Sequence, residues 1–204
     1  MKIICIGRNY PNHVKELNNE VPREPVFFMK PDSSLLRNND PFYIPEWTND
    51  VHHEVELILK ISRVGKCIEK CFAHRYYHEI GLGVDFTARD IQAQLIKEGL
   101  PWEKSKAFDR AAAVGPQFIP LKSLANPQEI SFRLEINGQP VQQGNSADMI
   151  FGFDAIISFV SRFVSLKMGD LIYTGTPVGV GAVKPDDRLE GFIEERKMFD
   201  FRVK

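Results

Sequence analysis

The chain is organised around the stretch His53-Glu54-Val55-Glu56-Leu57-Ile58-Leu59-Lys60. Polar and apolar residues alternate along it, which is the period of a strand with one buried face. Glu54 and Glu56 therefore point the same way, roughly 6.6 Å apart at about 3.3 Å per residue. Two carboxylates on one face repel each other unless a hard cation such as Mg²⁺ or Ca²⁺ lies between them. The alternative is that both face water, as most charged residues do.

A second segment offers a third carboxylate to this pair. Asp85 ends the apolar run Ile80-Gly81-Leu82-Gly83-Val84, and Phe86 to Asp90 follow it. Carboxylate oxygens are the ligands that hard divalent cations prefer. If the two segments are neighbours in the fold, Glu54, Glu56 and Asp85 form a candidate metal site.

Length and composition limit the classes of protein. The 204 residues suit one domain spanning 1–204, and 43% hydrophobic residues suffice for a core. A net charge of -1 argues against nucleic-acid binding through a basic surface. We expect no membrane association, because no apolar run approaches the ~18 residues of a membrane span. Three cysteines fit reduced thiols in a cytoplasmic protein.

Short strands and few helices are predicted along the rest of the chain. Asn137-Gly138 marks a two-residue hairpin turn, and Asp148 is a candidate N-cap for the most hydrophobic helix. Loops are expected over 32–50 and 109–116. Strands are expected over 3–6, 26–29, 53–60, 130–136, 139–143, 171–173 and 199–203, and helices over 13–17, 87–99 and 149–164.

Cys67, Cys71, His74 and His78 resemble a zinc set in composition. Their spacing predicts one face of a single helix, which would span about 16 Å at 1.5 Å per residue. Side chains spaced along the length of one helix cannot all bind one ion with bonds of about 2.0–2.3 Å. A helix stripe facing the core is therefore predicted in place of a zinc site.

His13 and Glu16 are three residues apart in a segment predicted to form one or two helical turns. At this spacing the two side chains meet on one helix face. A carboxylate beside a histidine orients the ring and raises its basicity, as a general base requires. An ordinary surface pair on a short helix is the alternative.

Several motifs in fixed order resemble the fumarylacetoacetate hydrolase family, from Ile6 to the C-terminus. The closest likeness is to its short members of the acylpyruvate hydrolase and oxaloacetate decarboxylase type. The motifs are Gly7-Arg8-Asn9-Tyr10, His13-x-x-Glu16, Phe28-Met29-Lys30-Pro31, His53-Glu54-x-Glu56-Leu57, Asp85-x-Thr87-Ala88-Arg89-Asp90, Pro101-Trp102, Lys106-x-Phe108 and Gly169-Asp170-x-x-x-Thr174-Gly175-Thr176-Pro177-x-Gly179-Val180-Gly181.

The resemblance implies an α+β, mainly β fold, a mixed β-sandwich roll with a few outer helices, in a homodimer. It implies a lid segment carrying the dyad, continuing into a variable segment at 17–24. It also implies roles for individual residues. These are Glu54, Glu56 and Asp85 as ligands of Mg²⁺ or Mn²⁺, His13, Glu16 and Lys106 as catalytic groups, and Arg8, Arg89, Gln92 and Thr176 as substrate-binding groups.

Three functions are compatible with the sequence. The resemblance implies a metal-dependent hydrolase that cleaves a C–C bond in acylpyruvates, with oxaloacetate decarboxylation as a related activity on a small 2-oxo acid. The second function is an isomerase or tautomerase of 2-hydroxyhepta-2,4-diene-1,7-dioate-type substrates, which needs no attacking water. The third is a non-catalytic protein that kept the fold. The retained His13-x-x-Glu16 pair favours hydrolysis, and the presence of all three carboxylates argues against the third.

Overall fold

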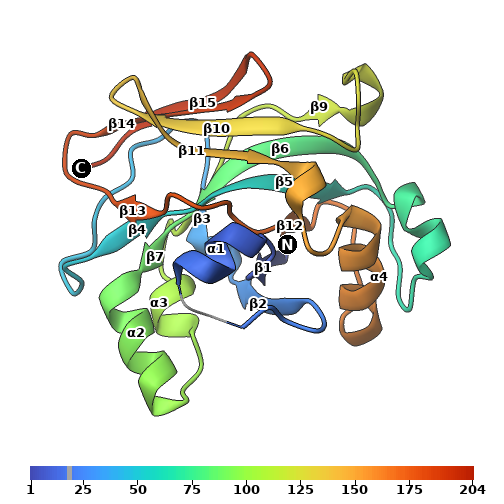
Figure 1. The fold of residues 1–204 in the computed structure, drawn as a ribbon, viewed down its shortest axis with the longest axis horizontal. Helices are drawn as coiled ribbons and strands as arrows, with labels where there is room; N and C mark the ends of the chain where they lie inside the picture. Colours follow the sequence, from blue (N-terminus) through green and yellow to red (C-terminus); the bar gives the residue numbers. More distant parts are fainter. Residues whose placement is uncertain (18–19) are drawn as a thin grey trace.

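The computed structural model describes residues 1–17 and 20–204 and has the mainly β architecture expected from the resemblance (Figure 1). Its central sheet runs in the order β2-β1-β12-β5-β6-β8-β3, and β9 pairs with β6. The sheet is mixed, because β1 and β12 are parallel whereas β5 and β6 are antiparallel. Its strands are β1 (Ile3–Gly7), β2 (Val26–Lys30), β3 (Leu35–Leu36), β5 (Val55–Ile61), β6 (Tyr77–Asp85), β8 (Ala112–Val114), β9 (Ile119–Pro120) and β12 (Leu171–Tyr173).

A second sheet, β11-β10-β14-β15, lies above the central sheet in Figure 1, and a small sheet, β13-β4-β7, extends from one end. Their strands are β4 (Val51–His53), β7 (Thr87–Ala88), β10 (Ser131–Ile136), β11 (Gln139–Asn145), β13 (Gly181–Ala182), β14 (Arg188–Ile193) and β15 (Arg196–Arg202). Asn137 and Gly138 turn β10 into β11 with φ of 54° and 77°, which confirms the predicted hairpin.

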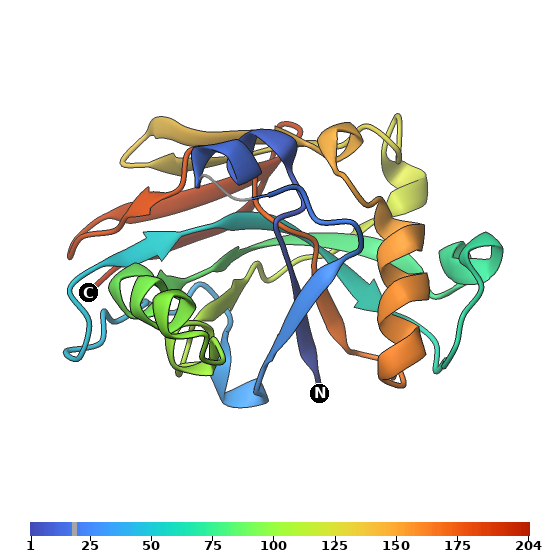
Figure 2. The same cartoon turned by 60° about the horizontal axis from the view of Figure 1, so that its bottom comes forward.

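Helix α4 lies on one side of the sheets and α2 and α3 on the other, whereas α1 lies near the middle of the view in Figure 1 (Figures 1 and 2). Within the described residues, none of them has the length and apolar character needed to cross a bilayer. The α-helices are α1 (Pro11–Glu16), α2 (Arg89–Glu98), α3 (Glu103–Lys106) and α4 (Phe153–Phe163), and the 3-10 helices are η1 (Asp32–Ser34), η2 (Lys70–Arg75), η3 (Leu121–Ser123) and η4 (Ser146–Asp148).

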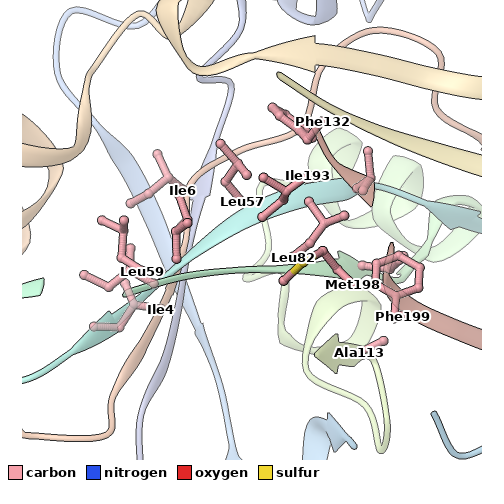
Figure 3. Packing of buried hydrophobic residues seen from close by; sticks show 14 of the residues in the cluster. Ile4, Ile6, Leu57, Leu59, Leu82, Ala113, Phe132, Ile193, Met198 and Phe199 are labelled. Atoms are coloured by element: carbon pink, nitrogen blue, oxygen red, sulfur yellow. The ribbon is translucent and has the colours of Figure 1, made fainter. Parts of the chain in front are cut away.

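The prediction that β5 has one buried face is wrong, because both faces of this strand are buried. Val55, Leu57 and Leu59 belong to the main core beneath the second sheet, where Figure 3 shows Leu57 near Ile193. Ile58 points the other way, into a smaller cluster with Tyr173 and its neighbours. Glu54 and Glu56 share the period-two face of Ile58. The carboxylates therefore lie on the buried side of the sheet that does not hold the main core.

The predicted helix over Cys67 to His78 is wrong. Cys67 has φ of 50°, η2 ends at Arg75, and β6 begins two residues later. Cys67 and Cys71 are exposed thiols and form no core-facing stripe. Pairing of β6 with β5 overrides the helical period of this segment. The absence of zinc from these residues stays a prediction.

Two smaller predictions also differ from the structure. The cap residue of α4 is Gly152, not Asp148, because Asp148 lies in η4, a separate turn capped by the side chain of Asn145. The expected loop at 109–116 contains β8, which pairs with β6 and β3. Short strands such as β8 are recognisable only from the partners on either side.

Asn9, just after β1, joins three distant segments. Its Nδ2 donates to the carbonyls of Phe151 at 3.0 Å and Thr174 at 2.8 Å, and its Oδ1 accepts from Phe151 N at 2.8 Å. A buried amide with these partners stabilises the chain where α1, α4 and the loop 174–181 meet. This junction positions the residues described next.

Candidate active site

A cleft at the end of the central sheet is lined by nearly every residue to which the resemblance assigns a role. Glu16 is outside the lining but is hydrogen-bonded to His13, which lines the cleft. The predicted residues in the lining are Arg8, His13, Glu54, Glu56, Asp85, Arg89, Gln92, Lys106 and Thr176. The apolar part of the wall includes Phe28, Ile96 and Trp102.

Strand pairing brings the three carboxylates together. Glu56 pairs with Gly83 across β5 and β6, and Asp85 lies two residues further along, on the same face. Asp85 N donates to Glu54 O at 2.8 Å, which places Glu54 beside Asp85. One oxygen from each of the three carboxylates lies within 4.8 Å of the others, and all three side chains are buried. The water-facing alternative for Glu54 and Glu56 is therefore wrong.

Cations surround two of these carboxylates. Lys106 Nζ donates to Glu54 Oε2 and Asp85 Oδ2, both at 2.9 Å. Arg89 Nη2 donates to Glu54 Oε1 at 2.6 Å. Lys30 Nζ lies 2.5 Å from Asp85 Oδ1, in ionic contact without hydrogen-bond geometry. Lys30 entered the sequence prediction only as part of a motif, although a lysine that ends an apolar strand before proline was a signal of a buried partner.

Arg89 is oriented by Gln92, as expected of two residues on the first turn of one helix. Arg89 Nη1 donates to Gln92 Oε1 at 2.6 Å, and Gln92 is buried. The guanidinium therefore bridges Gln92 and Glu54, and its place beside the acidic cluster is fixed from both sides.

The pKa values within the acidic cluster differ in direction. Burial opposes ionisation of Glu54, but the charges of Lys106 and Arg89 outweigh burial and hold the pKa of Glu54 well below its usual range. Burial raises the pKa of Glu56 well above its usual range, and the charges of Asp85 and Glu54 raise it further. Burial also opposes the charge of Lys106, but Asp85 and Glu54 outweigh it and raise the pKa of Lys106.

The three carboxylates fit a divalent cation as ligands. The environment of Glu56 supports this assignment. Its Oε2 accepts from Gly175 N at 2.6 Å, yet among residues 1–17 and 20–204 no lysine or arginine forms an ion pair with it. A buried carboxylate beside two others is stabilised by a cation in direct contact, and no described lysine or arginine makes that contact with Glu56. Oxygen ligands in this number suit Mg²⁺ or Mn²⁺.

His13 and Glu16 lie on α1, and their side chains are hydrogen-bonded to each other. His13 Nδ1 is 2.9 Å from Glu16 Oε2, and Gly179 N donates to Glu16 Oε1 at 3.0 Å. Because a carboxylate accepts, Nδ1 carries the hydrogen, and the lone pair of the neutral ring is at Nε2. His13 is buried and lines the cleft. The alternative of an ordinary surface pair is wrong. Of the variable segment 17–24, residues 18–19 are outside the described part of the chain.

Gly179→Ala should reduce turnover on the order of tenfold. Gly179 has φ of 99°, and a Cβ there would lie 2.5 Å from Val141 O, so the loop must shift and release Glu16. The control is Gly138→Ala, which has φ of 77° but open space around the new Cβ. Both variants carry the backbone strain, so steady-state rates that fall equally in both would contradict the role of this contact.

Trp102 and Phe28 form an aromatic wall that carries two cations. Lys106 Nζ lies 5.2 Å from the Phe28 ring centroid, and the Arg8 guanidinium lies 5.9 Å from the Trp102 centroid. The two rings meet edge to face at 5.9 Å. Arg8 has φ of 59°, a conformation that is uncommon outside glycine. The wall gives the cleft an apolar side next to positive charge, which suits a small organic anion.

A curled mixed sheet with a buried acidic triad beside a His–Glu pair defines the class of enzymes to which this chain belongs. The chain is a member of the fumarylacetoacetate hydrolase family. The family model described as "Fumarylacetoacetate (FAA) hydrolase C-terminal" matches residues 2–200. The family membership and fold class expected from the sequence are thereby confirmed.

Three proteins similar to this chain are named for different activities. Oxaloacetate tautomerase FAHD1, mitochondrial, of Rattus norvegicus is 40% identical over 201 residues, which cover 98% of this chain and 90% of the relative. The crystal structure of fumarylpyruvate hydrolase from Pseudomonas aeruginosa in complex with Mn²⁺ and pyruvate is 34% identical, with a TM-score of 0.93, and the match covers 100% of this chain and 89% of that chain. The 2-hydroxyhepta-2,4-diene-1,7-dioate isomerase from Mycobacterium marinum is 31% identical, with a TM-score of 0.85 and coverage of 99% and 73%.

Proposed function

We propose that this chain is a divalent-metal-dependent enzyme of small 2-oxo acids, which hydrolyses a C–C bond in acylpyruvates. Oxaloacetate, converted by tautomerisation or decarboxylation, is the proposed related substrate. The observation that carries the proposal is the His13 Nδ1–Glu16 Oε2 pair at 2.9 Å in the same cleft as the acidic triad. A mammalian relative named for oxaloacetate and a bacterial structure of a fumarylpyruvate hydrolase support this substrate class.

The chain's own residues divide the work of binding and proton transfer. Glu54, Glu56 and Asp85 would hold Mg²⁺ or Mn²⁺, which when bound supplies a Lewis acid that favours the enolate of a 2-oxo acid. Lys106 and Arg89 lie beside these carboxylates and would offset the negative charge that a substrate carboxylate adds.

His13 would act as the general base for hydrolysis. Its Nε2 would remove a proton from a water molecule that attacks the distal carbonyl, and Glu16 would stabilise the resulting imidazolium through Nδ1. Collapse of the adduct would break the C–C bond and leave the acid of the acyl group and the pyruvate enolate, which would take the proton back from the imidazolium. Phe28 and Trp102 give one side of the cleft an apolar lining. Decarboxylation of oxaloacetate needs no attacking water, so it depends less on His13.

A dienedioate isomerase is the second candidate function. The Mycobacterium marinum structure of that name supports it, and proton transfer by His13 alone would suffice for the chemistry. The formed dyad favours hydrolysis over this alternative, because a base held by a carboxylate is suited to activating water.

A substrate panel distinguishes the candidates. We expect turnover of acetylpyruvate or fumarylpyruvate with Mg²⁺ or Mn²⁺, a lower rate or tautomerisation with oxaloacetate, and loss of every activity in EDTA. Initial rates are followed by the decay of the enol absorbance, and an assay of released pyruvate separates cleavage or decarboxylation from tautomerisation, which forms no pyruvate. Rapid ketonisation of a dienedioate without any acylpyruvate cleavage would replace the hydrolase proposal with the isomerase. Full rates in EDTA would contradict metal dependence.

We also propose that the chain is one catalytic domain, pairs as a homodimer and acts in the cytoplasm. The described thiols of Cys5, Cys67 and Cys71 are free, which fits a reducing compartment. The family resemblance supports the dimer. Light scattering coupled to size-exclusion chromatography measures the mass of the particle in solution.

A further inference from the structure

Gln142 is a buried residue on β11 that is outside the predicted site. Its side-chain amide is hydrogen-bonded to Thr176, which lines the cleft. Its side chain is 1% exposed. Its Oε1 accepts from Val55 N at 3.0 Å and lies 2.9 Å from His53 Nδ1. Its Nε2 donates to Pro177 O at 3.0 Å and to Thr176 Oγ1 at 2.9 Å. Both ends of the amide are thus fully engaged.

The orientation of this amide is determined by its partners. Val55 N can only donate and Pro177 O can only accept, so an amide turned by 180° would lose both bonds. Oxygen and nitrogen are therefore assigned without ambiguity. It follows that His53 carries a hydrogen at Nδ1, since Gln142 Oε1 can only accept.

The same assignment fixes the polarity of Thr176. Because Gln142 Nε2 donates to Thr176 Oγ1, the hydroxyl oxygen is an acceptor in this bond and its own hydrogen is left to donate elsewhere. Thr176 is buried and lines the cleft that holds the acidic triad. In the part of the chain that the structure describes, that hydrogen has no protein acceptor.

The family resemblance already implies that Thr176 binds substrate, and we infer that Gln142 is the positioning residue that fixes Thr176 as a hydrogen-bond donor to a carboxylate oxygen. The inference rests on the proposed function in that the substrate is a 2-oxo acid. A hydroxyl that must donate favours an oxygen that only accepts, and among these an anionic carboxylate oxygen forms the stronger bond. Gln142 comes from the second sheet, so the β10–β11 hairpin contributes to substrate recognition without touching the substrate.

The test exchanges the amide for a carboxylate. In Gln142→Glu the new carboxylate can accept from Val55 N and His53 but cannot donate, so it takes the Thr176 hydrogen away from the substrate. We expect pyruvate, titrated by calorimetry at saturating Mg²⁺, to bind about tenfold more weakly, from the loss of one hydrogen bond to a charged group. KM for a turned-over substrate should rise more than kcat falls.

A double-mutant cycle separates this effect from a general one. Thr176→Val should weaken the binding of pyruvate to a similar extent. Adding Gln142→Glu to the Thr176→Val variant should not weaken pyruvate binding further. A further tenfold loss in that background would overturn the inference, since it would mean repulsion by the new charge or damage to the fold. Gln143→Glu adds the same charge on an exposed neighbour and should leave pyruvate affinity unchanged.

Gln142→Met provides a second line of evidence. It removes all four bonds and so should lower the thermal midpoint more than Gln142→Glu does, yet it leaves the Thr176 hydrogen free to donate. Pyruvate should therefore bind the Met variant more tightly than the Glu variant, the reverse of the order in stability. Affinities that follow the order of stability would show a purely structural role and overturn the inference.

The outcomes distinguish this inference from the proposed function. A wild type that binds pyruvate but turns over no member of the panel contradicts the proposed function alone. Turnover by the wild type with unchanged pyruvate affinity in Gln142→Glu contradicts the role of Gln142 alone. A wild type that binds no pyruvate at saturating Mg²⁺ overturns the inference, because Thr176 would then have no bound carboxylate to which it could donate.

Discussion

Glu56→Gln should lower the affinity for Mg²⁺ or Mn²⁺ on the order of 10²-fold or more and abolish turnover, because it removes a charged ligand from the acidic triad. Metal-free protein should nevertheless become more stable to heat near neutral pH. Burial and the charges of Asp85 and Glu54 disfavour an ionised group at this position, whereas an amide oxygen still accepts from Gly175 N. Calorimetric titration with Mg²⁺ and thermal unfolding in EDTA measure the two effects.

The pH dependence has a defined sign. Since the pKa of Glu56 is raised in the folded state, protonation favours folding, and stability is lost as the pH rises through the folded-state pKa. The thermal advantage of Glu56→Gln should therefore grow with pH and vanish below the ordinary glutamate pKa of about 4.3. Glu79→Gln, which removes a carboxylate paired with Lys60 at the surface, is the matched control. Wild-type affinity for Mg²⁺ in Glu56→Gln would rule out the triad as the metal site.

His13→Ala should reduce hydrolysis of an acylpyruvate by on the order of 10²–10⁴-fold, the effect of removing a general base. Decarboxylation of oxaloacetate should suffer much less, because stabilising the enolate is sufficient for loss of CO₂. The measurement is kcat for both substrates at saturating Mg²⁺. The difference arises because His13 lines the cleft and its Nδ1 is taken by Glu16, which leaves Nε2 as the nitrogen available to a water molecule.

The control for this variant is His78→Ala, which removes an exposed histidine of β6. It should leave both activities unchanged. Equal losses of hydrolysis and decarboxylation in His13→Ala would mean that His13 shapes or closes the cleft and does not activate water. Such a result would leave the metal-dependent part of the proposal in place.

The acidic triad and the His13–Glu16 pair were accessible from the sequence because each depends on local geometry. Glu54 and Glu56 share a face because strands have period two, and His13 meets Glu16 because helices bring i and i+3 together. Asp85 could be predicted to lie beside Glu54 and Glu56 only on the assumption that the two strand-like segments are neighbours in the fold. The family motifs then supplied roles that spacing alone left open.

Other features of the site were not predictable from spacing. Lys30 on β2 meets Asp85 at the end of β6, and Gln142 on the second sheet meets Thr176, although the residues of each pair lie far apart in sequence. The helical period of Cys67 to His78 was a misleading local signal, since pairing with β5 draws Tyr77 and His78 into β6. Propensities favour a local structure weakly, and tertiary pairing overrides them.

Family membership, the mainly β class and the acidic, histidine and lysine groups of the cleft could be predicted from short segments, because motif chemistry and spacing are local properties. Three features emerge only in the folded chain. These are the burial of both faces of β5, the lack of an ion-pair partner for Glu56 among the described residues while Glu54 has two, and the hydrogen bond by which Gln142 sets the direction of the Thr176 hydroxyl. Burial, charge balance and hydrogen-bond direction depend on residues that are far apart in sequence and meet only when the sheets pack.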